Sequence, residues 1–153
     1  MLKPGDIAPN FSVKDQYGKT QTLPSGQWVL LYFYPRDNTP GCTIEACVLR
    51  DKFTDLSQHL QVFGVSNDTV DSHQSFSEEF KLPFPLLADT NKEIIEPYQA
   101  WGERELLGKI SEGVIRISYL INPEGKVAKV YPQVNPAKHA QEVLEDIHTF
   151  KQS

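Results

Sequence analysis

The chain has 153 residues, the usual length of one domain, and 39% of them are hydrophobic, enough to bury a core. Fifteen Lys and Arg residues against twenty Asp and Glu residues give a formal net charge of −5. This acidic balance, without a basic block, argues against a general nucleic-acid binder and against a protein that binds anionic membranes. We expect a single domain over residues 1–153.

The N-terminus, MLKPGDIAPN, does not resemble a signal peptide, because Lys3 and Asp6 interrupt any apolar segment. The longest apolar run, WVLLYFY at 28–34, is far shorter than the ~20 residues that span a bilayer. Two cysteines are also too few for a disulfide-stabilised mini-domain. These features predict a cytoplasmic protein.

The N-terminal part contains an alternating stretch at 11–23 with a turn at Tyr17 and Gly18, which predicts a short hairpin. Residues 28–34 are apolar throughout, as expected of a central strand covered on both faces, and Pro35 ends this strand.

A helix is expected directly after this strand. Thr39 suits its N-cap, and Pro40 suits its first position because the missing N–H has no helical partner there. Cys42 then falls in the first turn. An apolar face at helical spacing is provided by Ile44, Val48, Leu49, Phe53, Leu56 and Leu60.

The next strand is expected at 62–66, so that strand, helix and strand form a right-handed parallel crossover. A second helix is predicted at 70–80, capped by Asp68 or Thr69. After this helix we expect an extended segment, a short helix and an irregular stretch, at 82–89, 91–98 and 99–113.

The C-terminal part predicts two strands joined by a turn and then a helix, at 114–121, 126–131 and 136–150. The order is therefore β-α-β-α, an insertion near 81–112, and β-β-α. It predicts an α/β protein with a thioredoxin-like fold. The central mixed β-sheet is flanked by helices, with an N-terminal β-hairpin and an insertion before the last ββα unit.

The chain has two cysteines, Cys42 and Cys47, five residues apart. At a helix N-terminus, unpaired N–H groups and the helix dipole stabilise an anion. A thiolate is the nucleophilic form of cysteine and is favoured at such a place. The position of Cys42 therefore fits a reactive cysteine, and it fits a small buried apolar residue equally well.

Neither a zinc site nor a structural disulfide fits this pair. A structural zinc site usually needs four ligands, and no ligand spacing connects the cysteines with His59, His73, His139 or His148. A Cys-x-x-Cys motif is also absent. Residues five apart on a straight helix have Cα atoms ~8.6 Å apart, beyond the ~7 Å that a disulfide spans. A Cys42–Cys47 bond therefore requires local opening of the helix, as in a redox switch.

Pro35, Thr39 and Cys42 match the P-x-x-x-[TS]-x-x-C signature of peroxiredoxins. The longer run YFYPRDNTPGCTIEAC resembles the bacterioferritin-comigratory-protein, or peroxiredoxin Q, subfamily of the AhpC/TSA superfamily. Four more segments agree in the same order: GDIAPNF at 5–11, LPFPLLAD at 82–89, WGERELLGK at 101–109 and GVIRISYLINPEG at 113–125. The resemblance implies a thioredoxin-fold thiol peroxidase that reduces hydrogen peroxide and organic hydroperoxides without metal, haem or flavin.

The resemblance also implies roles for individual residues. Cys42 would be the peroxidatic cysteine, whose thiolate attacks the O–O bond and becomes a sulfenic acid. Thr39, Gly41, Cys42 and Arg116 would bind the peroxide. The Arg116 donors would hold both the sulfur anion and the attacked oxygen, and Pro35 would shape and dry the pocket.

Two further residues complete the implied site. Cys47 would be the resolving cysteine, which forms an intramolecular disulfide with Cys42. Thioredoxin or a similar dithiol protein would then reduce this bond. Glu45 would pair with Arg116 or a neighbour and orient it. Members of this subfamily are often monomers, and we expect a monomer here.

Simpler interpretations exist for each residue. Thr39 suits a plain N-cap, Pro35 a strand end, and Arg116 a strand residue with an acidic partner. Tyr34 fits ordinary core packing, and His73 fits the surface of a helix.

Two other functions remain open from the sequence. One is a redox-switched sensor that uses the same cysteines, although no partner surface is evident. The other is a thiol–disulfide oxidoreductase that acts on proteins, against which the missing Cys-x-x-Cys motif counts.

Overall fold

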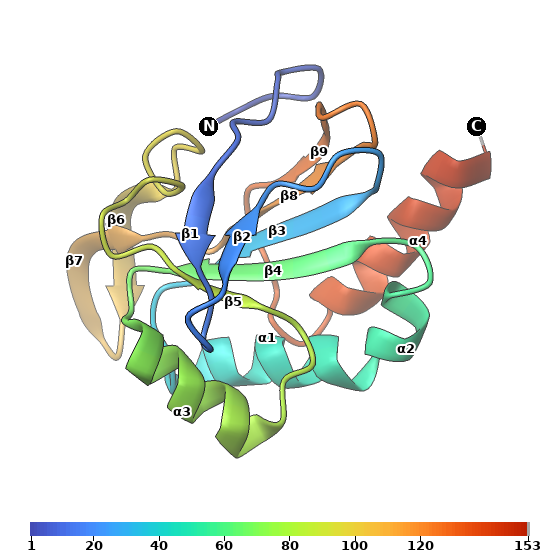
Figure 1. Ribbon diagram of the computed structural model, residues 1–153. Coiled ribbons are helices and arrows are strands. Elements are labelled where there is room, and N and C mark those ends of the chain that lie inside the picture. Colours follow the sequence, from blue (N-terminus) through green and yellow to red (C-terminus); the bar gives the residue numbers. More distant parts are fainter. Residues whose placement is uncertain (153) are drawn as a thin grey trace.

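The computed structural model describes residues 1–152, in which a five-stranded sheet is combined with two smaller hairpins and with helices (Figure 1). The strands are β1 (Ser12–Lys14), β2 (Thr20–Thr22), β3 (Val29–Phe33), β4 (Gln61–Ser66), β5 (Leu86–Ala88), β6 (Trp101–Leu106), β7 (Lys109–Val114), β8 (Ile117–Ile121) and β9 (Val127–Tyr131). The helices are α1 (Pro40–Asp51), α2 (Phe53–Leu56), α3 (Val70–Phe80) and α4 (His139–Gln152).

The central sheet has the order β5-β4-β3-β8-β9. Strands β3, β4 and β5 run parallel, whereas β8 pairs antiparallel with both β3 and β9. The sheet is therefore mixed, and α1 provides the crossover between the parallel strands β3 and β4. Strands β1 and β2 form the separate N-terminal hairpin. The predicted fold class is confirmed.

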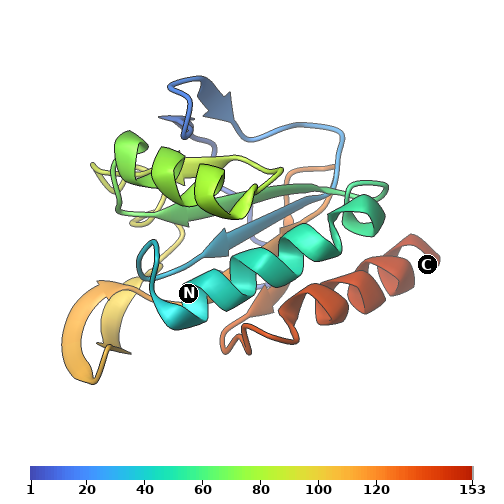
Figure 2. The same ribbon diagram turned by 90° about the horizontal axis from the view of Figure 1, so that it is seen from below.

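The central strand β3 is buried on both faces, as its apolar run predicts. Leu30 and Tyr32 point into a core with side chains of α1, α3 and α4. Val29, Leu31 and Phe33 point the other way, into a core with the N-terminal segment and the loop after β5. Figure 2 shows the three longer helices on the same side of the sheet.

The short helix expected at 91–98 is wrong, because this segment forms a series of turns. Lys92, inside this segment, has a positive φ of 59°, which a right-handed helix cannot contain. The Asp89 carboxylate accepts the backbone N–H groups of Glu93, Ile94 and Ile95. These bonds compact the segment without a continuous helix.

The stretch at 99–113, expected to be irregular, is largely the antiparallel hairpin β6–β7. Its tip, Leu107 and Gly108, has positive φ at both residues, as in a type I′ turn. The strand expected at 114–121 consequently starts only at Ile117, and Arg116 lies in the link between β7 and β8.

The helices also differ in detail from the prediction. Helix α1 ends at Asp51, the helix expected at 136–150 starts at His139, and Ile44 is exposed rather than part of an apolar face. The buried face of α1 carries Cys42, Glu45, Ala46 and Leu49. Among residues 1–152, the helices are too short or too polar to cross a membrane.

Candidate active site

Cys42 lies in the first turn of α1, in the core beneath the end of β3. Thr39 has the extended backbone of an N-cap, and Pro40 follows as the first helical residue. Cys42 is buried, and its Sγ accepts a hydrogen bond of 3.3 Å from Nη2 of Arg116. A thiolate here faces both a guanidinium and the positive end of a helix, two features that stabilise a sulfur anion.

Arg116 is held by Glu45, one turn after Cys42. Nη1 of Arg116 donates to Oε1 of Glu45 over 2.6 Å, and the Glu45 side chain is fully buried. Burial raises the pKa of Glu45 to about 7, and the charge of Arg116 limits this rise. A Cβ atom at Gly41 would come within 3.0 Å of Arg116 Nη2, so the glycine leaves room for the arginine.

Thr39 and Pro35 lie on the loop between β3 and α1, and both are buried. The N-cap interpretation of Thr39 is right for its backbone, but its side chain makes no capping bond. Its hydroxyl instead donates to the carbonyl of Arg36 over 2.8 Å. Because its hydrogen is used there, this hydroxyl offers only lone pairs to a ligand.

Cys47 lies one further turn along α1 and is partly exposed. Both cysteines are free thiols. Arg50 follows Cys47 by three residues, and its pKa is raised by the hydrogen bond to Asp51 and also by the charge of Cys47. The unbroken helix thus keeps the two sulfurs on separate turns.

Comparison with known proteins supports one family. Residues 4–130 match the AhpC/TSA family. Peroxiredoxin Bcp of Escherichia coli K12 is 42% identical over 146 residues, which cover 94% of each chain. The chain belongs to the AhpC/TSA family of peroxiredoxins.

Solved structures agree with this assignment. A crystal structure of PrxQ from Xylella fastidiosa superposes with a TM-score of 0.90 at 30% identity, covering 99% of this chain and 98% of that one. The peroxidoxin BcpB of Mycobacterium tuberculosis gives 0.85 at 31% identity, covering 97% and 98%.

The loop that carries Thr39 in this peroxiredoxin is tied to α3 and β5 through Asp37. The Asp37 carboxylate accepts from Tyr34 Oη at 2.6 Å and from Ser72 Oγ at 2.8 Å, and its Oδ2 lies 2.7 Å from His73 Nδ1. The other ring nitrogen of His73 donates to the carbonyl of Leu87. His73 is fully buried, so its predicted surface position is wrong.

Asp37 and His73, together with Asp68, form the one group of possible metal ligands among residues 1–152 of the peroxiredoxin, with ligand atoms within 4.8 Å of one another. Asp68 accepts from the backbone N–H of Asp37 and from Ser66 Oγ. These mutual hydrogen bonds already satisfy the ligand atoms. We therefore interpret the group as a brace for the loop.

Arg104 of β6 is a site neighbour that the sequence analysis missed. Its Nη1 donates to the carbonyl of Pro35 over 2.9 Å, and together with Pro35 and Arg116 it lines a cleft of about 460 Å³. Between two glutamates in the sequence, Arg104 has the pattern of a solvated strand. In the sequence, only Gly113 indicated that a side chain such as Arg104 packs here, since a glycine inside a strand often marks the close approach of another group.

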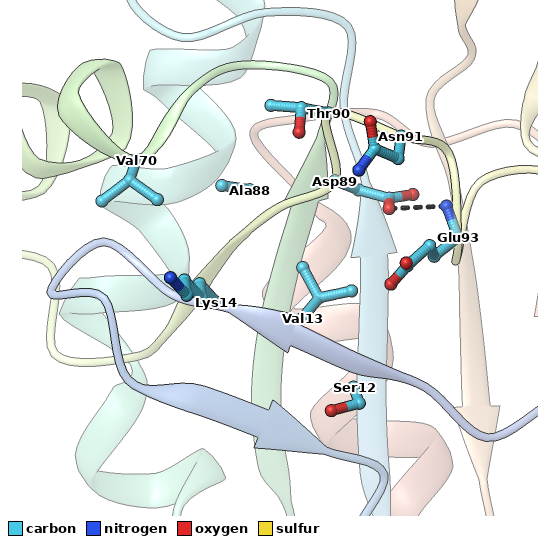
Figure 3. A pocket seen from close by; sticks show the side chains of 9 residues that line it. All are labelled: Ser12, Val13, Lys14, Val70, Ala88, Asp89, Thr90, Asn91 and Glu93. Atoms are coloured by element: carbon cyan, nitrogen blue, oxygen red, sulfur yellow. Dashed lines mark hydrogen bonds between the residues drawn. The ribbon is translucent and has the colours of Figure 1, made fainter.

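A second hollow of about 210 Å³ lies between β1 and the end of β5 (Figure 3). Its lining includes Asp89 and Lys14 but neither cysteine. The carboxylate of Asp89 accepts backbone N–H groups of the following turn, as the dashed line to Glu93 shows. Asp89 thus supports the turn after β5 in this peroxiredoxin.

Proposed function

We propose that this peroxiredoxin reduces hydrogen peroxide and organic hydroperoxides to water and alcohols, with Cys42 as the nucleophile. The observation that carries the proposal is the 3.3 Å contact between the Cys42 sulfur and Arg116 at the start of α1. The thiolate attacks one peroxide oxygen, the O–O bond breaks, and Cys42 becomes a sulfenic acid. The departing oxygen takes a proton and leaves as water or an alcohol.

Neighbouring groups assist this step. Arg116 stabilises the sulfur and the negative charge that develops on the oxygens, and Glu45 orients it. The Thr39 hydroxyl, which already donates to a carbonyl, accepts the O–H of the peroxide. The turn at Gly41 presents the backbone N–H of Cys42 to a peroxide oxygen, and Pro35 keeps water away from the pocket.

Cys47 then resolves the sulfenic acid. Its thiolate attacks the Cys42 sulfur, the S–O bond breaks, and a Cys42–Cys47 disulfide forms. The departing hydroxide takes up a proton and becomes water. Helix geometry sets their Cα atoms ~8.6 Å apart, so the first turns of α1 open for this step. Thioredoxin or a similar dithiol protein reduces the disulfide and is itself oxidised. The enzyme works as a cytoplasmic monomer, a single domain over residues 1–153, without a metal or cofactor.

The test is mass spectrometry with thiol counting before and after one equivalent of hydrogen peroxide. The wild type should lose two thiols and give a linked Cys42–Cys47 peptide. Cys47→Ser should reduce one equivalent and stop as a Cys42 sulfenic acid, whereas Cys42→Ser should be inactive.

Two outcomes would contradict the proposal. Peroxidase activity in Cys42→Ser would show that Cys42 is not the nucleophile. Normal turnover of Cys47→Ser with thioredoxin would show that Cys47 is not the resolving cysteine. Reduction of insulin disulfides together with a negligible peroxide rate would favour an oxidoreductase that acts on proteins.

A further inference from the structure

Arg104 connects the β6–β7 hairpin to the beginning of the active-site loop. Its Nη1 donates both to the carbonyl of Pro35 at 2.9 Å and to that of Val114 at 3.1 Å. Its Nε is buried and has no hydrogen-bond partner among residues 1–152. A buried donor without a partner is costly, so a role restricted to hairpin stability explains this arrangement poorly.

The position of this guanidinium depends on a glycine. Gly113 lies on β7, and a Cβ atom there would come within 2.3 Å of Cζ and 2.5 Å of Nε of Arg104. Its cross-strand partner, Gly102, would place a Cβ no closer than 3.6 Å to a side chain. Neither glycine has a positive φ. Gly113 is therefore required by Arg104, while Gly102 has no comparable constraint.

Arg104 also contributes charge to the site. Burial lowers the pKa of Arg104, and the negative charges of Cys42 and Asp68 oppose this effect. The attraction is mutual, so the same interaction favours the Cys42 thiolate. Arg116, bonded to Glu45, shares its charge with a carboxylate, whereas no ion pair within hydrogen-bonding distance is formed by Arg104 in the described part of the chain.

We propose that Arg104 is a second cation of the active site and a positioning residue for peroxide reduction. It fixes the carbonyl of Pro35, from which the loop leads to Thr39 and Cys42, and it adds a positive charge to the cleft that Arg116 also lines, which favours the Cys42 thiolate. Gly113 keeps its guanidinium in place. The proposal rests on the proposed role of Cys42 as the nucleophile.

The test compares Arg104→Ala, Arg104→Lys and Gly113→Ala with the matched control Gly102→Ala. Two readouts are taken: the second-order rate of Cys42 oxidation by hydrogen peroxide, and the pH profile of Cys42 alkylation by iodoacetamide in a Cys47→Ser background. Urea unfolding of each variant verifies that it folds.

Arg104→Ala should lower the peroxide rate about tenfold, the factor expected from the loss of one hydrogen bond to a charged group. It should also move the half-maximal pH of alkylation upward. Gly113→Ala should reproduce both effects although Arg104 is still present, and Gly102→Ala should resemble the wild type. Arg104→Lys, which keeps the charge, should restore the alkylation profile but only part of the rate.

The double variant Arg104→Ala with Gly113→Ala is decisive. With the guanidinium gone, the added Cβ has nothing to displace, so the second substitution should cause no further loss. Additive losses, or a wild-type alkylation profile in Arg104→Ala, would overturn the proposal. Failure of the proposed function looks different, because the wild type itself would then form no sulfenic acid at Cys42.

Discussion

A single buried carboxylate, that of Glu45, holds the arginine that faces Cys42. Its position on the same helical face as Cys42 makes it part of the site rather than of the surface. The second oxygen, Oε2, and the hydroxyl of Tyr32 are both buried without hydrogen-bond partners among residues 1–152. The negative charge of ionised Glu45 is therefore only partly compensated, although Arg116 lies beside it.

This burial makes stability depend on pH. The pKa of Glu45 is raised from 4.5 to about 7 by desolvation in the fold, so the folded protein holds this proton more tightly than the unfolded chain. The free energy of unfolding should fall as the pH rises from about 4.5 to about 7, by roughly 3 kcal/mol at most.

Glu45→Gln removes the titrating group, so it should flatten this part of the profile. Urea unfolding of the reduced protein at pH 5 and pH 8 measures the difference. Glu79→Gln, which replaces an exposed glutamate of α3, should retain the wild-type dependence. If the free energy of unfolding depended on pH in the same way in the wild type and in Glu45→Gln, Glu45 would not be the group responsible.

The residues of the site could be predicted from the sequence to the extent that a local motif carries them. Thr39, Cys42 and Cys47 occur within nine residues of one another, and helix geometry alone places both cysteines. Arg104 and His73 approach the site from distant segments. Their contacts depend on how the hairpin and α3 pack, which no local pattern specifies.

At the scale of elements, the loop between β3 and α1 is braced from two sides. The hairpin β6–β7 reaches it through Arg104, and α3 reaches it through His73. The hairpin escaped prediction because its side chains alternate between exposed and half-buried positions, leaving no apolar periodicity to detect. Its tip also places Leu107 at positive φ, where a glycine or asparagine would have indicated a turn.

The brace from α3 should contribute strongly to stability. Asp37→Ala removes the acceptor of the Tyr34 and Ser72 hydroxyls and breaks the buried contact with His73, and it should cost about 3–5 kcal/mol. Asp51→Ala is the matched control, since it breaks an exposed pair with Arg50 worth less than about 1 kcal/mol.

Urea unfolding at neutral pH measures both losses. The peroxide rate of Asp37→Ala should fall as well, because the loop with Thr39 loses a support. Equal losses in the two variants would show that the buried cluster is no brace.

At the scale of the whole molecule, the proposed catalytic cycle requires part of the fold to open. The first turns of α1 bury Cys42 and Ala46 and hold the pair of Glu45 with Arg116. A Cys42–Cys47 bond cannot form while these turns are helical. In the proposed cycle, the stability of α1 therefore opposes disulfide formation, and each turnover has to unfold and refold the turns that activate Cys42.

Oxidation should consequently destabilise the protein, although a disulfide usually has the opposite effect. A bond that closes so short a loop restrains the unfolded chain by about 2 kcal/mol. Opening the first turns of α1 breaks several helical hydrogen bonds, each worth about 1 kcal/mol, and exposes the buried Ala46, at a total cost of about 3–5 kcal/mol. The free energy of unfolding should then fall by about 1–3 kcal/mol after one equivalent of peroxide.

Urea unfolding and far-ultraviolet circular dichroism, before and after that equivalent, measure the fall and the accompanying loss of helix. Cys47→Ser is the control: it is oxidised at Cys42 but cannot form the bond, so it should keep its helix content. An oxidised wild type with unchanged helix content and equal or higher stability would mean that the two sulfurs meet without opening α1. Because an intact helix holds the two Cα atoms too far apart for a disulfide, that outcome would contradict the course of α1 described above.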